Sequence, residues 1–270
     1  MGILRPKPRE RVRLLPRDPV PLVYADQKPK SEEARIRDLV VPILRERYPG
    51  ARIIHEFPLR YSHSRLDLAA VTSTRIIGVE IKSFIDTHER LEKQLSLFAP
   101  ICHRLFAVLH DSWHDHRFAH EVGGRVFGYE TTTDILKRVR DHTTGYHVPV
   151  WWVDPDAGLV RDRLKPVFKP AWRNLPPRPA LAPDLPGFLF GPRARLWGYK
   201  LLGILHRAEL LAIAERCKIK FEKRRQSHTH LVDLLSEELS GKVITSEVCH
   251  ALRTRRGFAK LSDPPITVTS

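Results

Sequence analysis

Apolar residues recur at helical spacing in the segment after Ser31, and this pattern predicts an amphipathic helix. Ser31 followed by Glu32 and Glu33 is typical of a helix start, because serine caps free amides and acids favour the positive end of the helix dipole. Glu33 shares the apolar face, which is an unusual place for a carboxylate. Pro42 lies inside the pattern and is expected to kink or shorten the helix. The apolar positions are Ile36, Val40, Ile43 and Leu44.

Extended runs of β-branched and apolar residues follow a turn signal at residues 48–50. Residues 66–71 and 76–82 are separated by a short polar stretch, which predicts a β-hairpin. The other elements expected in this part of the chain are strands at 52–59, 104–110, 126–129 and 148–153 and helices at 87–98 and 133–140. This alternation of strands and helices predicts an α/β fold with a central mixed sheet flanked by helices.

Two proline-rich segments divide the chain. Residues 1–30 contain six prolines and eight basic residues against three acids, so we expect an extended basic arm. Residues 165–192 contain eight prolines, and helical patterns follow at 201–217, 229–239 and 246–253. The expected organisation is an arm at 1–30, an α/β domain at 31–164, a proline-rich linker at 165–194, a smaller all-helical domain at 195–258 and a tail at 259–270.

Composition adds a strong positive charge to this picture. The 270 residues include 46 Lys and Arg against 31 Asp and Glu, a formal net charge of +15. Nucleic acid is the commonest large anion that such a surplus attracts. The sequence has no run of 18 apolar residues, so we expect no membrane partner. The cysteines Cys102, Cys217 and Cys249 lie far apart and are expected to be reduced thiols of a cytoplasmic protein.

The predicted hairpin carries the candidate chemistry. Because side chains alternate along a strand, Glu80 and Lys82 share one face of it, and Asp67 lies on the neighbouring strand. Apolar neighbours imply that this cluster is mostly buried, and burying charges without partners is costly. Two carboxylates with water ligands suit Mg²⁺ or Mn²⁺, which would offset that cost.

A divalent cation at this position suits phosphodiester hydrolysis. It lowers the pKa of a bound water and neutralises charge on a phosphate oxygen. Lys82 is placed to orient the water and to bind the phosphate. Glu33 and Gln94 face inward on the two predicted helices, so we expect Glu33 to hold a second metal or a water and Gln94 to position Lys82 or the DNA backbone.

These residues resemble the PD-(D/E)xK nuclease superfamily, whose core is a helix, a three-stranded sheet, a helix and a further strand. The resemblance implies a restriction-endonuclease-like core and metal-dependent cleavage of DNA. Residues 80–94 are most similar to a branch of small uncharacterised bacterial and phage proteins with a helical C-terminal region. The matching positions are Asp67, Glu80 and Lys82, with Glu33 in place of the first-helix glutamate and Gln94 in a Gln-x-x-x-Phe version of the Gln-x-x-x-Tyr signature.

Two positions depart from the superfamily pattern. Leu66 stands where a proline often precedes the Asp, and Phe98 replaces the tyrosine, so a hydroxyl contact is lost. The three central residues also form a short pattern that arises by chance, and the alternative is a surface hairpin with solvated charges. Glu56 is either a further acid of the metal site or a charge at the sheet edge.

A basic hinge between the C-terminal helices is a second candidate site. It is either a nucleic-acid-binding element or the charged surface of an ordinary helical bundle. The candidate binding residues are Lys218, Lys220, Lys223, Arg224 and Arg225.

Aromatic and histidine residues give weaker signals. Trp151 and Trp152 are adjacent, so one is expected to face away from the core, where an exposed ring is available to stack on a base. The histidines between residues 110 and 120 are expected to lie in a solvated loop rather than to bind zinc.

The sequence thus predicts a Mg²⁺- or Mn²⁺-dependent deoxyribonuclease. The alternatives are a DNA-binding protein that keeps the nuclease fold without cutting and a regulatory protein with a basic surface. DNA is the expected partner, RNA is a possible substitute, and oligomer formation, cleavage mode and biological pathway are left open.

Overall fold

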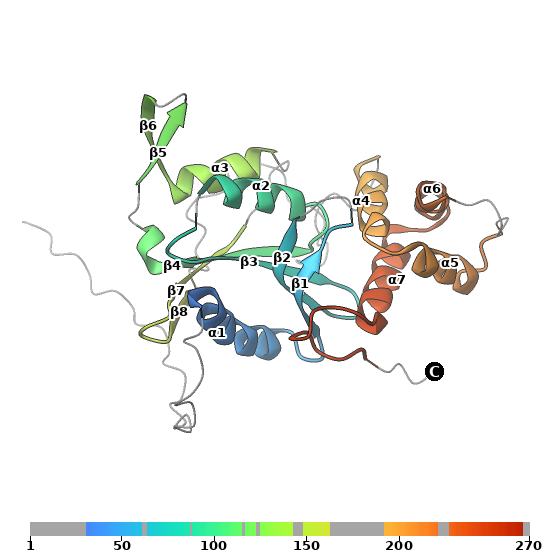
Figure 1. The fold of residues 1–270 in the computed structure, drawn as a ribbon. Coiled ribbons are helices and arrows are strands. Elements are labelled where there is room, and N and C mark those ends of the chain that lie inside the picture. The colour runs from blue at the N-terminus through green and yellow to red at the C-terminus, as the bar shows by residue number, and fades with distance from the viewer. Residues whose placement is uncertain are drawn as a thin grey trace, which may run out of the picture.

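A six-stranded sheet forms the centre of the computed structural model (Figure 1). The structure describes residues 31–60, 64–86, 88–114, 117–122, 125–142, 148–162, 192–220 and 227–266. The strands of the sheet, in spatial order, are β1 (Arg52–Pro58), β2 (Arg65–Val71), β3 (Ile76–Lys82), β4 (Arg104–His110), β7 (Val150–Asp154) and β8 (Leu159–Asp162).

The sheet is mixed. β1, β2 and β3 form an antiparallel meander. β4 pairs in parallel with β3, β7 pairs in parallel with β4, and β8 returns antiparallel to β7. The helix α1 (Glu32–Arg47) precedes the meander, and α2 (His88–Phe98) connects β3 to β4. This architecture confirms the predicted α/β class, and the order of helix, three strands, helix and strand is the order that the resemblance implied.

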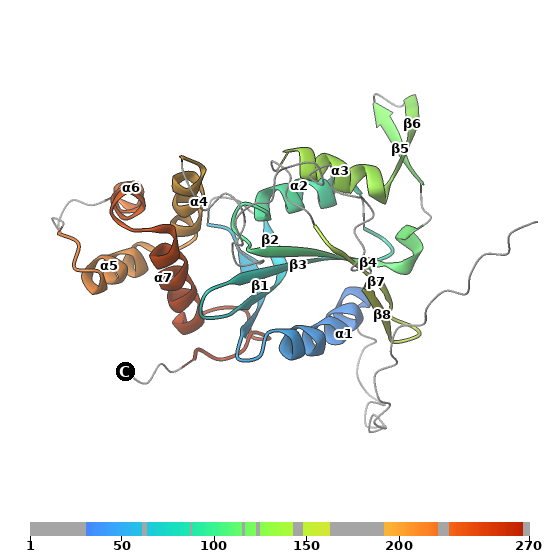
Figure 2. The same cartoon turned by 180° about the vertical axis from the view of Figure 1, so that it is seen from behind.

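Helix α1 covers one face of the sheet (Figures 1 and 2). The Ser31 side chain accepts a hydrogen bond from the amide of Ala34, as its position before two acids predicts. Pro42 does not shorten the helix, which continues to Arg47. Pro42 is exposed, so the helical hydrogen bond that it cannot donate is missing on the solvent side, where water can replace it. The buried contacts of α1 come from Ile36, Val40 and Leu44.

Helices α2 and α3 (Thr132–His142) cover the opposite face of the sheet (Figures 1 and 2). Leu91, Leu95 and Phe98 of α2 are fully buried there. A separate hairpin of β5 (Arg117–Val122) and β6 (Arg125–Thr131) precedes α3 and projects beyond it. The solvated loop expected for the histidines between residues 110 and 120 is therefore wrong in part, because His110 ends β4 and His120 lies in β5, which pairs with β6.

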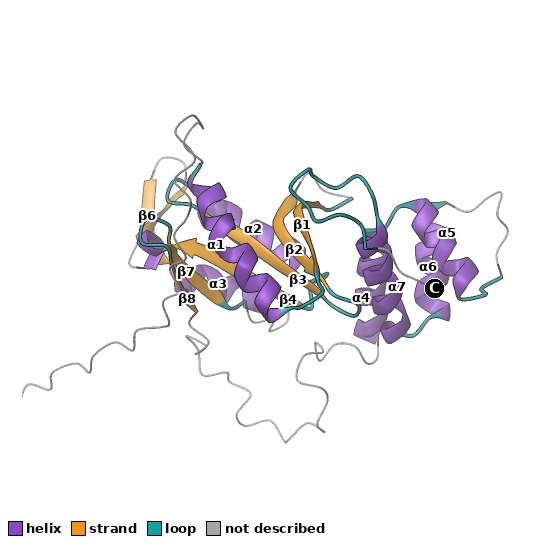
Figure 3. Ribbon diagram, turned by 90° about the horizontal axis from the view of Figure 1, so that it is seen from below, coloured by secondary structure: helices purple, strands orange, loops and turns teal. Residues whose placement is uncertain are grey.

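The C-terminal helices lie beside β1 and β2 (Figure 3). They are α4 (Pro192–Gly203), α5 (Arg207–Arg216), α6 (His228–Glu238) and α7 (Gly241–Thr254), and they confirm the predicted helical C-terminal region. The prediction of a single helix at 201–217 is wrong, because residues 204–206 are not helical and separate α4 from α5. The amide of His206 there donates to the carboxylate of Glu209 at 2.6 Å, which caps the start of α5. Among the described residues, every helix is too short or too polar to cross a membrane.

Arg52 joins the C-terminal helices to the sheet. Its side chain is 2% exposed, and its Nη1 donates to the backbone oxygens of Leu252, Arg253 and Arg255 at 2.6–3.1 Å. These are carbonyls at and just after the C-terminal end of α7, which a cation stabilises. Its Nε donates to the backbone oxygen of Asp263 at 3.0 Å.

Residues Ser262 and Asp263 protect the outer edge of β1. The Asp263 amide donates to the Ile53 carbonyl at 2.8 Å, and the Asp263 carboxylate accepts from the Ile53 amide at 2.9 Å. The Ser262 hydroxyl accepts from the His55 amide at 2.9 Å. An edge strand with free amides is a template for pairing with another chain. Pro264 and Pro265 follow and cannot donate to a ladder, so the segment satisfies the edge without extending the sheet.

Replacing Asp263 with alanine tests this edge protection. Asp263→Ala leaves the Ile53 amide without its carboxylate acceptor and breaks the ion pair with Arg45, so we expect the free energy of unfolding to fall by about 1–3 kcal/mol. Urea denaturation measures the loss. Asp233→Ala removes an exposed carboxylate of α6 as a control, and an equal loss in both variants would contradict the prediction.

Candidate functional site

The candidate site forms where β2 and β3 separate. Their pairing ends at Leu68 and Val79, and beyond that pair the Asp67 carboxylate accepts a hydrogen bond from the Ile81 amide at 2.6 Å. The Asp67 side chain thus takes the place of a β2 carbonyl as the acceptor of this β3 amide. This exchange opens the sheet locally and holds Asp67 beside the residues that flank Ile81.

Lys82 is fixed between a carboxylate and an amide. Glu80 and Lys82 lie two residues apart on β3 and face α2, which carries Gln94. The Lys82 Nζ donates to Glu80 Oε1 at 2.6 Å and to Gln94 Oε1 at 2.8 Å. The Glu80 side chain is fully buried and that of Lys82 is 3% exposed. The ammonium group therefore has a defined position at the end of β3.

Burial raises the pKa of both acids. Burial raises the pKa of Asp67 to about 6, although the Ile81 amide and the charge of Lys82 lower it. Burial and the nearby charge of Asp67 raise the pKa of Glu80 to about 8, against the opposing effect of Lys82. Glu80 Oε2 is buried without a hydrogen-bond partner. The positive charge of Lys82 is thus too small to offset the cost of burying both carboxylates in their ionised forms.

Asp67 also belongs to a second group of acids on the α1 side. Oxygens of Glu33, Glu56 and Asp67 lie within 4.8 Å of one another, and the three side chains come from α1, β1 and β2. Arg37 donates to both Glu33 and Glu56, the latter at 2.9 Å, and its side chain is 12% exposed. Three convergent carboxylate oxygens are a ligand set that suits a hard divalent cation.

Glu56 has a strained backbone. Its φ is +51°, in the left-handed region that non-glycine residues rarely adopt and that costs about 1–3 kcal/mol. It lies between the paired residues His55 and Phe57, opposite Asp67. Strain of this kind persists only where the surroundings impose it. The structure therefore places Glu56, whose role the sequence left open, beside two of the predicted metal ligands.

The five residues predicted to carry catalysis lie around the opening between β2 and β3, but they divide into two contact groups. Glu80, Lys82 and Gln94 are joined by hydrogen bonds, whereas Glu33 contacts Arg37 and lies near Asp67 and Glu56. Arg37 was not predicted as a site residue, although its position four residues after Glu33 on a helix was a signal for an ion pair.

The other candidates are less complete. Lys218 and Lys220 are exposed at the end of α5, and Lys218 has a left-handed φ of +56°. Lys223, Arg224 and Arg225 lie outside the described residues. The expectation that one of Trp151 and Trp152 is exposed is wrong, because helices cover both faces of β7 and the two residues are 0% and 7% exposed.

Comparison with known proteins gives limited matches. A family model described as bacteriophage P4 protein cII matches residues 26–140, which is less than half of the chain and includes all five predicted catalytic residues. A solved structure of SfsA from Pyrococcus furiosus in complex with Ca²⁺ is similar at 20% identity and a TM-score of 0.27. The match covers 48% of this chain and 59% of that chain. None of the curated proteins matches the chain.

The raised pKa of Glu80 predicts a pH effect on stability. Between the ordinary value near 4.5 and about 8, folded Glu80 holds a proton that the unfolded chain has released, so stability falls as pH rises. In metal-free protein, Glu80→Gln removes this penalty. We expect the variant to gain up to about 1.4 kcal/mol per pH unit relative to the native protein between pH 5 and about pH 8.

Urea denaturation of both proteins at several pH values in EDTA measures this difference. The matched control is Glu46→Gln, which removes an exposed carboxylate of α1. A stability difference that stays constant with pH, or a gain as large in the control, would show that Glu80 is not held protonated.

Proposed function

We propose that this protein is a divalent-metal-dependent deoxyribonuclease of the PD-(D/E)xK type. The observation that carries the proposal is the position of the Lys82 ammonium, held by Glu80 and Gln94 while Asp67 bonds to the intervening residue, Ile81. The order of the core elements and the net charge of +15 agree with a nuclease core that acts on a polyanion.

The donor set fits a cation. Asp67, Glu33 and Glu56 offer convergent oxygens, and Glu80 Oε2 is a buried acceptor with no partner in the described protein. A cation bound to these residues would stabilise their ionised forms and offset the burial that raises the pKa of Asp67 and Glu80. Mg²⁺ or Mn²⁺ is the natural choice because all of the ligands are hard oxygens.

Beside the cation, the protein's own residues orient the water, the phosphate and the metal ligands. When bound, the cation supplies charge neutralisation at the phosphate and a water with a lowered pKa. Lys82 donates its third Nζ hydrogen to the attacking water or to a non-bridging phosphate oxygen. Glu80 and Gln94 prevent that ammonium from turning away, and Arg37 keeps the carboxylates of Glu33 and Glu56 oriented.

The second candidate function is DNA binding without cleavage. It is favoured by the hydrogen bonds that already occupy Lys82 and by the protonation that burial imposes on Glu80. In that case the cluster would be a closed polar network that stabilises the core. Lys218 and Lys220, with Lys223, Arg224 and Arg225, would then supply the phosphate contacts.

Thermal unfolding in Mg²⁺ or Mn²⁺ tests cation binding without reference to activity. At about 100 times the dissociation constant, we expect the native protein to gain ~5–10 °C in Tm. Asp67→Asn keeps an acceptor for the Ile81 amide but removes the shared ligand charge, so most of the gain should disappear. Asp233→Asn is the control on α6. An undiminished gain in Asp67→Asn would place the cation elsewhere.

Cleavage assays separate the two candidate functions. Linear, nicked, branched and single-stranded DNA are incubated with Mg²⁺, Mn²⁺ or EDTA, and RNA serves as a substrate comparison. We expect metal-dependent cutting that falls at least ~100-fold in Lys82→Ala and in Asp67→Asn, because the first removes the ammonium that contacts the water or the phosphate and the second removes a charged ligand of the cation.

Lys242→Ala, which removes an exposed lysine of α7, is the control for the loss of one positive charge. Salt-sensitive binding without cutting, unchanged in Lys82→Ala and Asp67→Asn, would support the binding protein instead. Failure to bind DNA at all would contradict both functions.

A further inference from the structure

The loop after β3 presents an aromatic ring to solvent on a fixed backbone. The Trp113 indole donates to the Ser83 carbonyl at 3.0 Å, and the Ser83 amide donates to Asp86 at 2.9 Å. The Phe84 amide donates to the Glu32 carboxylate at 3.3 Å. The Phe84 side chain is nevertheless 64% exposed. The loop backbone is therefore held in place while the ring stays exposed, which suits contact with another molecule.

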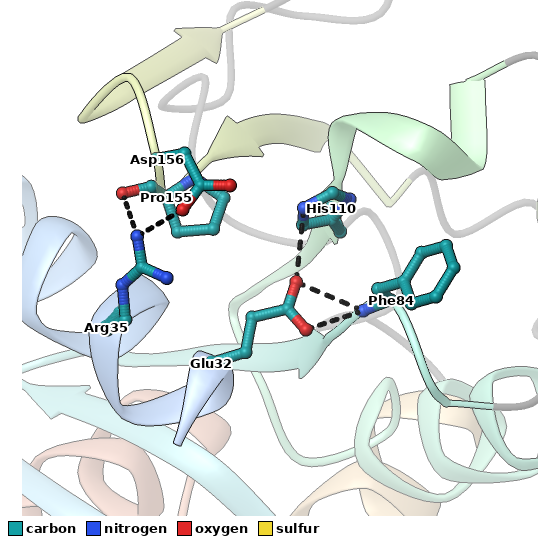
Figure 4. A pocket seen from close by; sticks show the side chains of 6 residues that line it. All are labelled: Glu32, Arg35, Phe84, His110, Pro155 and Asp156. Carbon is teal, nitrogen blue, oxygen red and sulfur yellow. Dashed lines mark hydrogen bonds and ion pairs between the residues drawn. The ribbon is translucent and has the colours of Figure 1, made fainter. Parts of the chain in front are cut away.

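A hollow of about 340 Å³ lies next to this ring (Figure 4). Within it, His110 Nε2 lies 3.1 Å from Glu32, and Arg35 donates to Asp156 at 2.6 Å and to the Pro155 carbonyl at 2.8 Å. The His110 and Phe84 rings are 6.1 Å apart and nearly edge to face. The volume is within the range of ~300–1,000 Å³ that ligand sites occupy. The hollow thus combines aromatic surface with both acceptors and donors.

This hollow and the proposed metal site share two elements, α1 and the end of β3 with the loop after it. Glu32 of the hollow is the sequence neighbour of Glu33 on α1, and Phe84 follows Lys82 by two residues, a span of at most ~7 Å between Cα atoms. A nucleotide whose phosphate reaches Lys82 therefore has its own or a neighbouring base within reach of Phe84.

We propose that the hollow receives an unpaired nucleobase of the DNA substrate, stacked on Phe84 beside the His110 ring, with its polar edge toward Glu32 and Arg35. This proposal rests on the proposed nuclease function and adds a substrate class to it. The preferred DNA is single-stranded or locally unpaired beside the scissile phosphate, because bases inside an intact duplex are not free to enter.

The chemistry of the hollow matches a base better than an apolar peptide side chain. Unpaired bases stack on aromatic rings and present donors and acceptors on their edges. The Glu32 and Asp156 carboxylates can accept from exocyclic amino groups, and the Arg35 guanidinium can donate to ring nitrogens or carbonyls. A leucine or valine from a protein partner would desolvate these charged groups without offering them a hydrogen bond.

The test measures binding of labelled single-stranded DNA and of the matching duplex in EDTA, where no cutting occurs. Stacking on an aromatic residue is worth a factor of roughly 5–150 per base. We expect Phe84→Ala and Phe84→Leu to weaken single-strand binding within that range and duplex binding less than twofold. Phe84→Trp should keep the native affinity. Leu261→Ala, at a 69% exposed leucine remote in sequence from the site, is the matched control.

Parallel cleavage assays distinguish failure of this inference from failure of the nuclease function. If metal-dependent cutting needs Lys82 but the Phe84 variants bind single strands normally, the nuclease function stands and the base pocket is wrong. If Phe84→Leu binds as tightly as the native protein, apolar area rather than stacking is responsible and the proposal fails. An equal loss on duplex and single strand would also overturn it. Selective single-strand loss without any cutting would support the pocket and contradict the nuclease.

Discussion

The carboxylates of Asp67 and Glu80 and the ammonium group of Lys82 lie together in a buried part of the sheet. Two acids and one base leave an excess of negative charge there, and the rest of the site depends on how that excess is balanced. Lys82 can pair with only one acid at close range, and Glu80 occupies it at 2.6 Å. Asp67 is left with the Ile81 amide, and burial raises the pKa of both acids. A buried polar group without a partner, such as Glu80 Oε2, is costly unless a ligand satisfies it. A resident divalent cation would satisfy it and balance the charge.

The surrounding fold keeps this corner open. The hydrogen bond from Ile81 to Asp67 replaces a ladder contact, so β2 and β3 part at the site. On the neighbouring strand β1, Glu56 with its left-handed backbone lies opposite Asp67. Strand β1 is in turn held on its outer edge by Ser262 and Asp263 and at its start by Arg52, which binds the end of α7. The C-terminal residues thus support the strand that carries one of the acids.

Much of the core could be predicted because local patterns and tertiary contacts agree there. The hairpin of β2 and β3 follows from alternation and a short turn, and its register places Asp67 near Glu80. The break between α4 and α5 was not predicted, although Gly203 at the end of α4 and the cap from Glu209 were local signals for it. The role of Glu56 required a left-handed backbone that propensity does not predict. The exposed ring of Phe84 could not be told from a core residue, because its exposure depends on contacts of the loop backbone with distant residues, Glu32 at the Phe84 amide and Trp113 at the Ser83 carbonyl.

The most direct test of the account is a crystal structure of the protein soaked in Mn²⁺, with data collected where manganese scatters anomalously. The account predicts an anomalous peak at the opening between β2 and β3, with carboxylate oxygens of Asp67 and at least one of Glu80, Glu33 and Glu56 about 2.1–2.3 Å from the ion. A peak that avoids Asp67, or an occupied site elsewhere with Lys82 and Glu80 unchanged, would contradict it.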